Sequence, residues 1–246
     1  MLLSTQFHTY EPAIRSLPVD RALTQADLLT EEFLMERHGQ LETYYAPHNE
    51  YVNLSAKIVI IGITPGWTQM RIAMQEARKG LEKGLADEEI GKRAKEEARF
   101  AGSMKHHLIS LLNALQLHKH LNLPSCEELF GEHRELLHST SLLPYPVFFH
   151  KKNYTGSRPN LLSTPSLLEA ARLHMAEELR LLGQILIIPL GKTVESVLRL
   201  LEREGKLDGR QCLWGFPHPS GANGHRHKQF KGAEGQMRQI LQQAVF

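Results

Sequence analysis

One run of residues constrains the fold of this chain more than any other. In Lys57–Gly62, four β-branched apolar residues stand together and end abruptly in glycine. Such a short, wholly apolar run is typical of a parallel strand that is buried on both faces. Pro65 and Gly66 follow, and the charge-rich segment 69–100 has a helical pattern. The order strand, loop, helix predicts an α/β fold, in which ligands bind beyond the carboxyl ends of the strands.

The rest of the chain continues this alternation. Further strands are predicted at 136–143, 185–188 and 211–216. Helices are predicted at 20–45, 106–117, 168–182, 194–203 and from Lys228 to the C-terminus. We therefore expect one domain over residues 1–246, a three-layer α/β/α sandwich with a central four-stranded, mostly parallel sheet. Residues 1–45 should form an N-terminal helical extension packed on it.

Composition excludes several classes of protein. The 29 basic and 27 acidic residues leave a net charge of +2, so the overall charge indicates no particular partner. No apolar run approaches the roughly 18 residues of a membrane span, and the first residues lack the pattern of a signal peptide. Only Cys126 and Cys212 are present, which favours a reducing, cytoplasmic or otherwise intracellular location. We expect a monomer without membrane contact.

The first candidate site is the loop that follows the strand 57–62. It reads Gly62-Ile63-Thr64-Pro65-Gly66. Glycines allow a ligand to approach the backbone closely, and proline stiffens the loop, so backbone amides are presented in a fixed arrangement. Taken alone, the loop fits an ordinary structural turn equally well.

The second candidate site follows the last predicted strand. His218 stands between Pro217 and Pro219, and prolines on both sides hold its side chain at the carboxyl end of that strand. A histidine held in this way can donate a hydrogen bond or stabilise an anion. The segment 217–232 contains three basic residues and no acid, so its polar groups could bind phosphate oxygens. The alternative is a purely structural proline turn.

A third segment, Phe149–Pro159, has basic residues and aromatic residues but no acid. Its cations are Lys151, Lys152 and Arg158. This composition could contact a nucleic-acid backbone, and a solvated surface loop is the alternative. The chain also has 14 histidines, some of them two residues apart, but no pattern of a zinc site accompanies them. We expect neither a metal nor a cofactor.

Together, the first loop near the start and His218-Pro219-Ser220 after the last strand resemble the uracil-DNA glycosylase superfamily. Ile187–Gly191 also resembles that family's penultimate strand, and the resemblance covers residues 45–246. It implies base excision repair: members flip a damaged base, usually uracil, out of DNA and hydrolyse its N-glycosidic bond. His218 would stabilise the negative charge on the leaving base.

The resemblance also implies roles for the residues around these loops. The first loop would position the attacking water through Thr64 and contact the base. The DNA, a damaged or mismatched duplex or a single strand, would be bound by the second and third segments. The residues concerned are Ser220, Asn223, His225, Arg226, Lys228, Lys151, Lys152 and Arg158.

Two features depart from the family pattern. Many members place Asp or Asn where this chain has Thr64, whose hydroxyl can accept a hydrogen bond from water but is a poor base. The family's base-reading asparagine is missing from the second strand, where Ser139 and Thr140 stand, so Asn153 is the substitute nearest in sequence. A flipped base also stacks on a ring, for which Trp67 and Phe100 are candidates, with ordinary core packing as the alternative. The predicted base pocket is completed by Gly62, Ile63, Pro65 and Gly66.

Three hypotheses for function follow. The leading one is a monofunctional DNA glycosylase acting on uracil or another deaminated base. The second is a nucleic-acid-binding protein of the same fold without catalytic activity, which the two departures favour. The third is an α/β enzyme for a free nucleotide or nucleoside, in which the first loop cradles phosphate.

Overall fold

The computed structural model describes residues 1–4, 6–100 and 103–244, which form two compact units. The first unit comprises Met1–Val52, Thr64–Ala101 and Leu143–Pro159. The second comprises Asn53–Ile63, Gly102–Leu142 and Asn160–Phe246. One passage of the chain from unit to unit falls inside the first loop, between Ile63 and Thr64. The single domain expected from the sequence stays a prediction.

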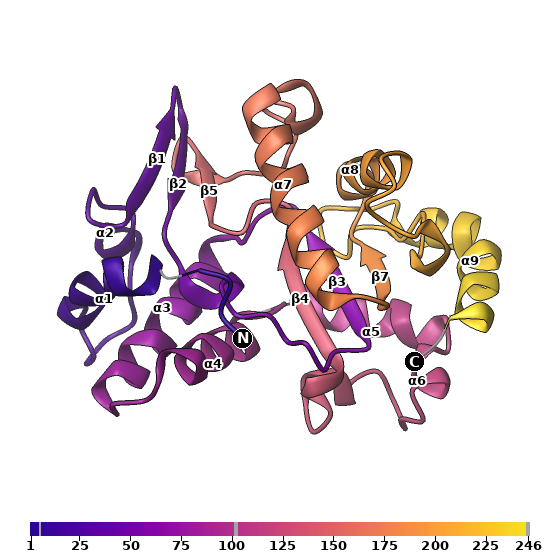
Figure 1. Ribbon diagram of the computed structural model, residues 1–246, viewed down its shortest axis with the longest axis horizontal. Coiled ribbons are helices and arrows are strands. Elements are labelled where there is room, and N and C mark those ends of the chain that lie inside the picture. Colours follow the sequence, from indigo (N-terminus) through magenta and orange to yellow (C-terminus); the bar gives the residue numbers. More distant parts are fainter. Residues whose placement is uncertain (5, 101–102, 245–246) are drawn as a thin grey trace. The chain divides into compact units, whose positions relative to one another are not determined.

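The second unit is built on a parallel sheet with the strand order β4-β3-β7 (Figure 1). The central strand β3 (Ile58–Gly62) pairs with β4 (Leu137–Ser141) on one side and with β7 (Leu186–Pro189) on the other. Ile58–Ile61 are completely buried, because β3 has a neighbour at each edge and is covered on both faces. The strands predicted at 57–62, 136–143 and 185–188 are therefore confirmed.

The predicted fourth strand is not confirmed. In the segment 211–216, only Cys212 pairs with the sheet, through a single parallel bridge to Ile187. The amide of Leu213 still donates to the carbonyl of Ile187 at 2.8 Å. The amide of Trp214 then bonds back to the carbonyl of Cys212, and Gly215 adopts a φ of +82°. This turn carries the chain away from β7, so the parallel sheet of the described residues has three strands instead of four.

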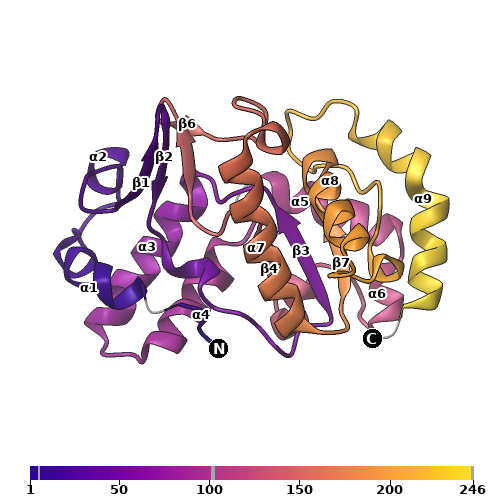
Figure 2. The same ribbon diagram turned by 45° about the horizontal axis from the view of Figure 1, so that its top comes forward.

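Helices lie on both sides of this sheet. In two views, α7 lies in front of the strands and α5 behind them (Figures 1 and 2). The helices predicted at 106–117, 168–182, 194–203 and near the C-terminus are confirmed. The helices of the second unit are α5 (Ser103–Ala114), α6 (Leu117–His120), α7 (Pro165–Leu182), α8 (Lys192–Arg203) and α9 (Arg226–Gln243). Its 3-10 turns are Glu128–Phe130, Arg134–Leu136, Leu161–Ser163 and Gly209–Gln211.

The first unit contains an antiparallel sheet with the order β1-β2-β5-β6. Its strands are β1 (Leu34–His38), β2 (Leu41–Tyr44), β5 (Val147–Phe149) and β6 (Lys152–Asn153). The helical interpretation of residues 20–45 was wrong, because only α2 (Gln25–Leu28) is helical there. Gly39, with a φ of +60°, then reverses the chain into a hairpin. The pairing of β2 with β5, which is distant in sequence, outweighs the helical spacing of the apolar residues in 20–45.

Helices and a hydrophobic core complete the first unit. The helices are α1 (Gln6–Ser16), α2, α3 (Trp67–Glu82) and α4 (Asp87–Ala98), with a 3-10 turn at Pro47–Asn49. The predicted helical segment 69–100 is therefore confirmed as two helices. The core includes Tyr44, Tyr45, Met70 and Phe148, all nearly without exposure. No helix in the described part of the chain is long and apolar enough to cross a membrane.

Candidate functional site

Thr64 is held on two sides by the segment that precedes β5. Its hydroxyl donates to the carbonyl of Tyr145 at 2.8 Å and accepts from the amide of Val147 at 3.0 Å. A hydroxyl has one proton and two lone pairs, so Thr64 keeps a single lone pair for any further partner. The side chain therefore ties the first loop to residues 145–147. It has no free proton to donate, and it can only accept a hydrogen bond from a water.

Asn153 and the end of the first loop come together in the first unit. The amide of Trp67, the first residue of α3, donates to Asn153 Oδ1 at 2.8 Å. A Cβ on Gly66 would lie 3.1 Å from Asn153 Nδ2, so the carboxamide fills the space that a side chain at Gly66 would need. The amide of Gly66 also donates to Gln69 Oε1 at 3.1 Å. The substitute chosen from the sequence thus contacts the predicted pocket loop directly.

The two candidate aromatic rings differ in exposure. Trp67 is half-buried and packs against the hydrophobic core of the first unit. Phe100 is only 5% exposed, and its φ of +49° places it in the left-handed region. Both rings are therefore engaged in packing, which agrees with the core alternative for each. Of the two, Trp67 keeps the larger share of accessible surface.

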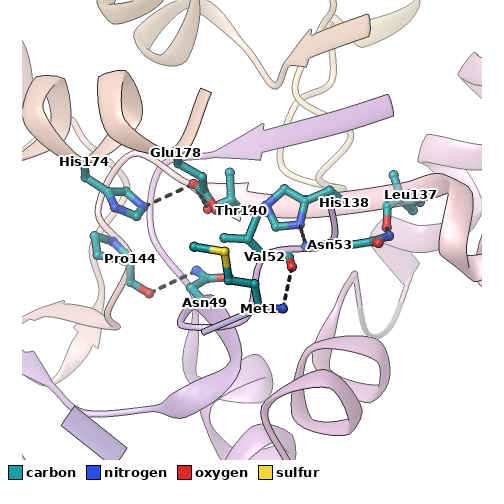
Figure 3. Close-up of polar contacts among 10 residues, drawn as sticks. All are labelled: Met1, Asn49, Val52, Asn53, Leu137, His138, Thr140, Pro144, His174 and Glu178. Carbon is teal, nitrogen blue, oxygen red and sulfur yellow. Dashed lines mark hydrogen bonds and ion pairs between the residues drawn. The ribbon is translucent and has the colours of Figure 1, made fainter. Parts of the chain in front are cut away.

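The residues of β4 face a buried polar cluster on α7. Thr140 donates to Glu178 Oε2 at 2.7 Å, and His138 Nε2 lies 2.8 Å from Glu178 Oε1 (Figure 3). The amide of Asn53 approaches His138 Nδ1 at 3.4 Å, so Nε2 carries the proton that Glu178 accepts. Burial opposes ionisation of Glu178, yet His138 and His174 hold its pKa well below the usual range. The hydroxyl of Thr140 is therefore committed inside the second unit, and Ser139 is also buried.

His218 is a neutral hydrogen-bond donor. The amide of Ser220 donates to His218 Nδ1 at 3.2 Å, which makes Nδ1 an acceptor. Burial lowers the pKa of His218 below 6.5, so the ring is uncharged near neutral pH. In a neutral imidazole whose Nδ1 accepts, the proton sits on Nε2. The half-buried side chain can therefore direct an N–H group at a developing negative charge.

Gly191 lies directly against His218 and is hydrogen-bonded to the backbone just before it. Its φ is +86°, and a Cβ at this position would lie 3.2 Å from the Cβ of His218. Its amide donates to the carbonyl of Phe216 at 3.0 Å. Glu195, on α8, accepts from the amide of Gly215 at 3.0 Å and fixes the turn before the loop. Gly191 ends the run that resembles the family's penultimate strand. The sequence alone does not show that this glycine packs against His218.

The residues predicted to bind DNA fall into two groups. The side chains of Asn223 and Arg226 donate hydrogen bonds to backbone carbonyls of their own loop. Lys151 forms an ion pair with Glu42 at 2.7 Å. Ser220 is half-buried, and its amide serves His218. The others are exposed, and no hydrogen bond or ion pair of their side chains occurs within the described ranges. These exposed residues are His225, Lys228, Lys152 and Arg158.

Residues 1–4, 6–100 and 103–244 contain no group of three or more His, Cys, Asp or Glu side chains able to hold a metal ion. The chemistry offered by the described residues is that of hydrogen bonds and fixed dipoles. In the second unit it centres on the Nε2–H of His218. In the first unit it centres on the carboxamide of Asn153 beside Gly66 and Trp67.

Comparisons with known proteins indicate the family of the chain. The family model of the Uracil DNA glycosylase superfamily matches residues 49–242. The chain is also 46% identical over 221 residues to the "Uncharacterized protein YoxB" of Bacillus subtilis (strain 168). That match spans 89% of this chain and 86% of the relative. The match to the family model includes the first loop, β4, β7 and the loop of His218.

Proposed function

Because the chain belongs to the Uracil DNA glycosylase superfamily, we propose that it hydrolyses the N-glycosidic bond of uracil or another deaminated base that is flipped out of DNA. The observation that carries this proposal is the neutral His218, whose Nε2–H is left as a donor by the Ser220 amide at Nδ1. A leaving base needs such a donor, because it departs with the electron pair of the bond.

The reaction divides into departure of the base and addition of water. The C1′–N bond breaks with its electron pair going to the base, and the water oxygen bonds to C1′ while its proton goes to solvent. One preorganised donor to a developing anion typically contributes about a hundredfold to a thousandfold in rate. The hydroxyl of Thr64 already donates to Tyr145 and is a poor base, so its contribution is limited to orienting water through its remaining lone pair.

Asn153 supports a preference for deaminated bases. Because Trp67 fixes Oδ1, the free edge of the carboxamide is Nδ2, a donor. A donor pairs with a carbonyl oxygen and not with an amino group. Deamination exchanges an amino group for a carbonyl, so this orientation favours uracil or hypoxanthine over cytosine or adenine.

The exposed cations supply the contacts with DNA. Lys228 and His225 stand at the start of α9, close in sequence to His218, while Lys152 and Arg158 belong to the first unit. Ser220 can add hydrogen bonds to the phosphates. Base flipping costs a few kcal/mol and is least costly at a mismatch or in a single strand, so release should be faster from these substrates.

The test is single-turnover release of base from DNA containing uracil, hypoxanthine or xanthine, at enzyme in excess. We expect release from at least one substrate, and His218→Ala should slow it about a hundredfold or more. His227→Gln, an exposed change on α9, is the matched control and should leave the rate unchanged. Absence of release from all three substrates would contradict the proposal, and an unchanged rate in the His218 variant would remove that residue from the mechanism.

A second function is favoured by one observation. Both hydrogen bonds of Thr64 tie the loop to Tyr145 and Val147, so this hydroxyl does not serve as a base for water. A protein that binds damaged DNA without releasing the base would not need a residue that activates water. It would show salt-dependent binding of damaged DNA but no release of base at any enzyme concentration.

A further inference from the structure

A closed circuit of hydrogen bonds surrounds the loop that carries His218. Asn223 Nδ2 donates to the carbonyl of His218 at 3.0 Å. Arg226 Nη1 donates to the carbonyl of Asn223 at 3.3 Å, and Arg226 Nη2 lies 3.3 Å from Nε2 of His107 on α5. His107 Nδ1 lies 3.0 Å from the carbonyl of Pro219, the residue next to His218. The circuit thus leaves His218 on one side and returns to it on the other.

The chemistry of the partners fixes the protonation of His107. A guanidinium only donates hydrogen bonds, and a carbonyl only accepts them. Arg226 therefore requires a lone pair on His107 Nε2, and Pro219 requires a proton on Nδ1. Only one form of the ring, the neutral tautomer with its proton on Nδ1, satisfies both partners. His107 thus connects α5 and α9 to the loop in one defined state.

The part of the loop beyond Pro219 needs such a support, because the prolines at 217 and 219 restrict only the backbone beside His218. Gly221 and Gly224 flank Ala222-Asn223, and residues 221, 222 and 224 are exposed. Glycine lowers the cost of alternative backbone conformations. Besides the contact of His107 with the carbonyl of Pro219, the side chain of Asn223 holds the backbone carbonyl of His218.

We propose that His107 is a positioning residue for His218, and that Arg226 serves this loop as a latch on His107 and Asn223 instead of binding a DNA phosphate. The role given to His107 rests on the proposed function, because it acts through His218. The assignment of Arg226 stands apart from catalysis. It replaces the DNA contact expected for this residue from the sequence.

The first test separates a latch from a phosphate contact. Binding of a duplex carrying an abasic-site analogue is measured over a range of salt concentrations. Loss of one phosphate contact lowers the salt slope by about one. For Arg226→Gln, we expect an unchanged slope and a Kd within about twofold of the parent value, whereas Lys228→Gln should lower the slope. A lowered slope for Arg226→Gln would overturn the latch.

The second test measures the rate of base release under single turnover. His107→Leu removes both hydrogen bonds and should lower the rate about tenfold to a hundredfold, as expected for a displaced catalytic group, with little change in Kd. His107→Asn keeps a donor near the place of Nδ1 and should recover part of the loss. The double variant with Arg226→Gln should lose less than the product of the single effects. Unchanged release by His107→Leu, or fully multiplicative effects, would refute the proposal.

The third test is independent of catalysis. Nitrogen-15 shifts of the imidazoles report which ring nitrogen carries the proton. In the parent protein, His218 should be protonated on Nε2 and His107 on Nδ1. His107→Leu should move the His218 signals toward a mixture of tautomers, whereas the exposed neighbouring change His106→Leu should not. Unaltered His218 signals in His107→Leu would overturn the positioning role, even if the protein proved to have no glycosylase activity.

Discussion

Glu50 gives a prediction whose sign and size follow from the structure. The residue is 3% exposed, and its carboxylate lies among hydroxyl groups of the first unit. Tyr145 donates to Oε1 at 2.8 Å, Ser4 to Oε1 at 3.3 Å and Tyr45 to Oε2 at 3.3 Å. Two effects oppose each other here, since burial disfavours the charged form and the donors favour it. Burial dominates and raises the pKa of Glu50 from 4.5 to about 7.

The consequence is a loss of stability with rising pH. Between pH 4.5 and about 7, folded Glu50 retains a proton that the unfolded chain has released. The free energy of unfolding falls wherever the folded state binds more protons and the pH rises, so it falls across this window and is level above it. The difference between 4.5 and about 7 corresponds to about 3 kcal/mol.

The assay is urea denaturation of the parent protein and of Glu50→Gln between pH 4.5 and 8. Glutamine keeps the shape of the protonated acid but cannot ionise. Relative to the parent, the variant should therefore gain about 3 kcal/mol of unfolding free energy as the pH rises. The other titrating groups cancel in this comparison, and the exposed change Glu32→Gln is the control. A difference that is flat with pH, or that changes in the opposite direction, would show that the three hydroxyl donors outweigh burial.

Three further predictions follow from single contacts. Gly191→Ala should cost about 1–3 kcal/mol of stability, because a residue other than glycine is strained at a φ of +86°; it should also slow base release, as measured by thermal denaturation and single-turnover rates. Thr64→Val keeps the shape but removes both hydrogen bonds of the hydroxyl, and should cost about 1–3 kcal/mol for the buried groups left unpaired, with a smaller loss of rate than His218→Ala. Glu178→Gln should cost about 1–3 kcal/mol at pH 7, because the two carboxylate oxygens accept from His138 and Thr140 and a glutamine offers only one acceptor oxygen for these two buried donors. Since the pKa of Glu178 is lowered, this loss should shrink as the pH falls below 4.5, which denaturation series at pH 3–7 would measure.

Local patterns were sufficient for the three paired strands and for the longer helices of the second unit. The run Ile58–Ile61 is apolar throughout because β3 is covered on both faces, and this requirement is visible in any single sequence. The segment 211–216 was also expected to be a strand, but it contains no β-branched residue and ends in a turn. The turn depends on Gly215 and on the support of Glu195, a contact across 20 residues that periodicity does not encode.

The hairpin β1–β2 lies in a segment that was predicted to be helical but forms strands. Leu28, Leu29, Phe33 and Leu34 have a spacing that suits one face of a helix. The antiparallel pairing of β2 with β5 joins residues more than a hundred positions apart, and this partner decides the conformation. A short segment with mixed signals takes the structure that its distant neighbour stabilises.

The sequence allowed residues to be proposed where their own side chains would carry the chemistry, but not where a residue acts through another one. His218 was proposed because prolines flank it in a loop that resembles the family's, and Asn153 because it lies close in sequence to the strand that lacks the family's asparagine. His107 was missed, since its partner Pro219 lies 112 residues away and a lone histidine on an amphipathic helix has no distinctive pattern. A DNA contact was expected for Arg226 because the family resemblance implies it for the residues that follow His218, but its guanidinium contacts the carbonyl of Asn223 and the ring of His107.

The two loops would contribute to the proposed reaction in different ways. Thr64 stands where many members have an acidic or amide residue, and its hydroxyl is bound to the backbone of Tyr145 and Val147, so it ties down the first loop and, in the proposed reaction, does not act as a base for water. The second loop keeps its histidine and surrounds it with support from Gly191 and Ser220. Catalysis that depends on departure of the base requires a fixed donor more than it requires a base for water. This chain has the fixed donor, His218. Loss of His218 should therefore lower the rate far more than loss of the Thr64 hydroxyl.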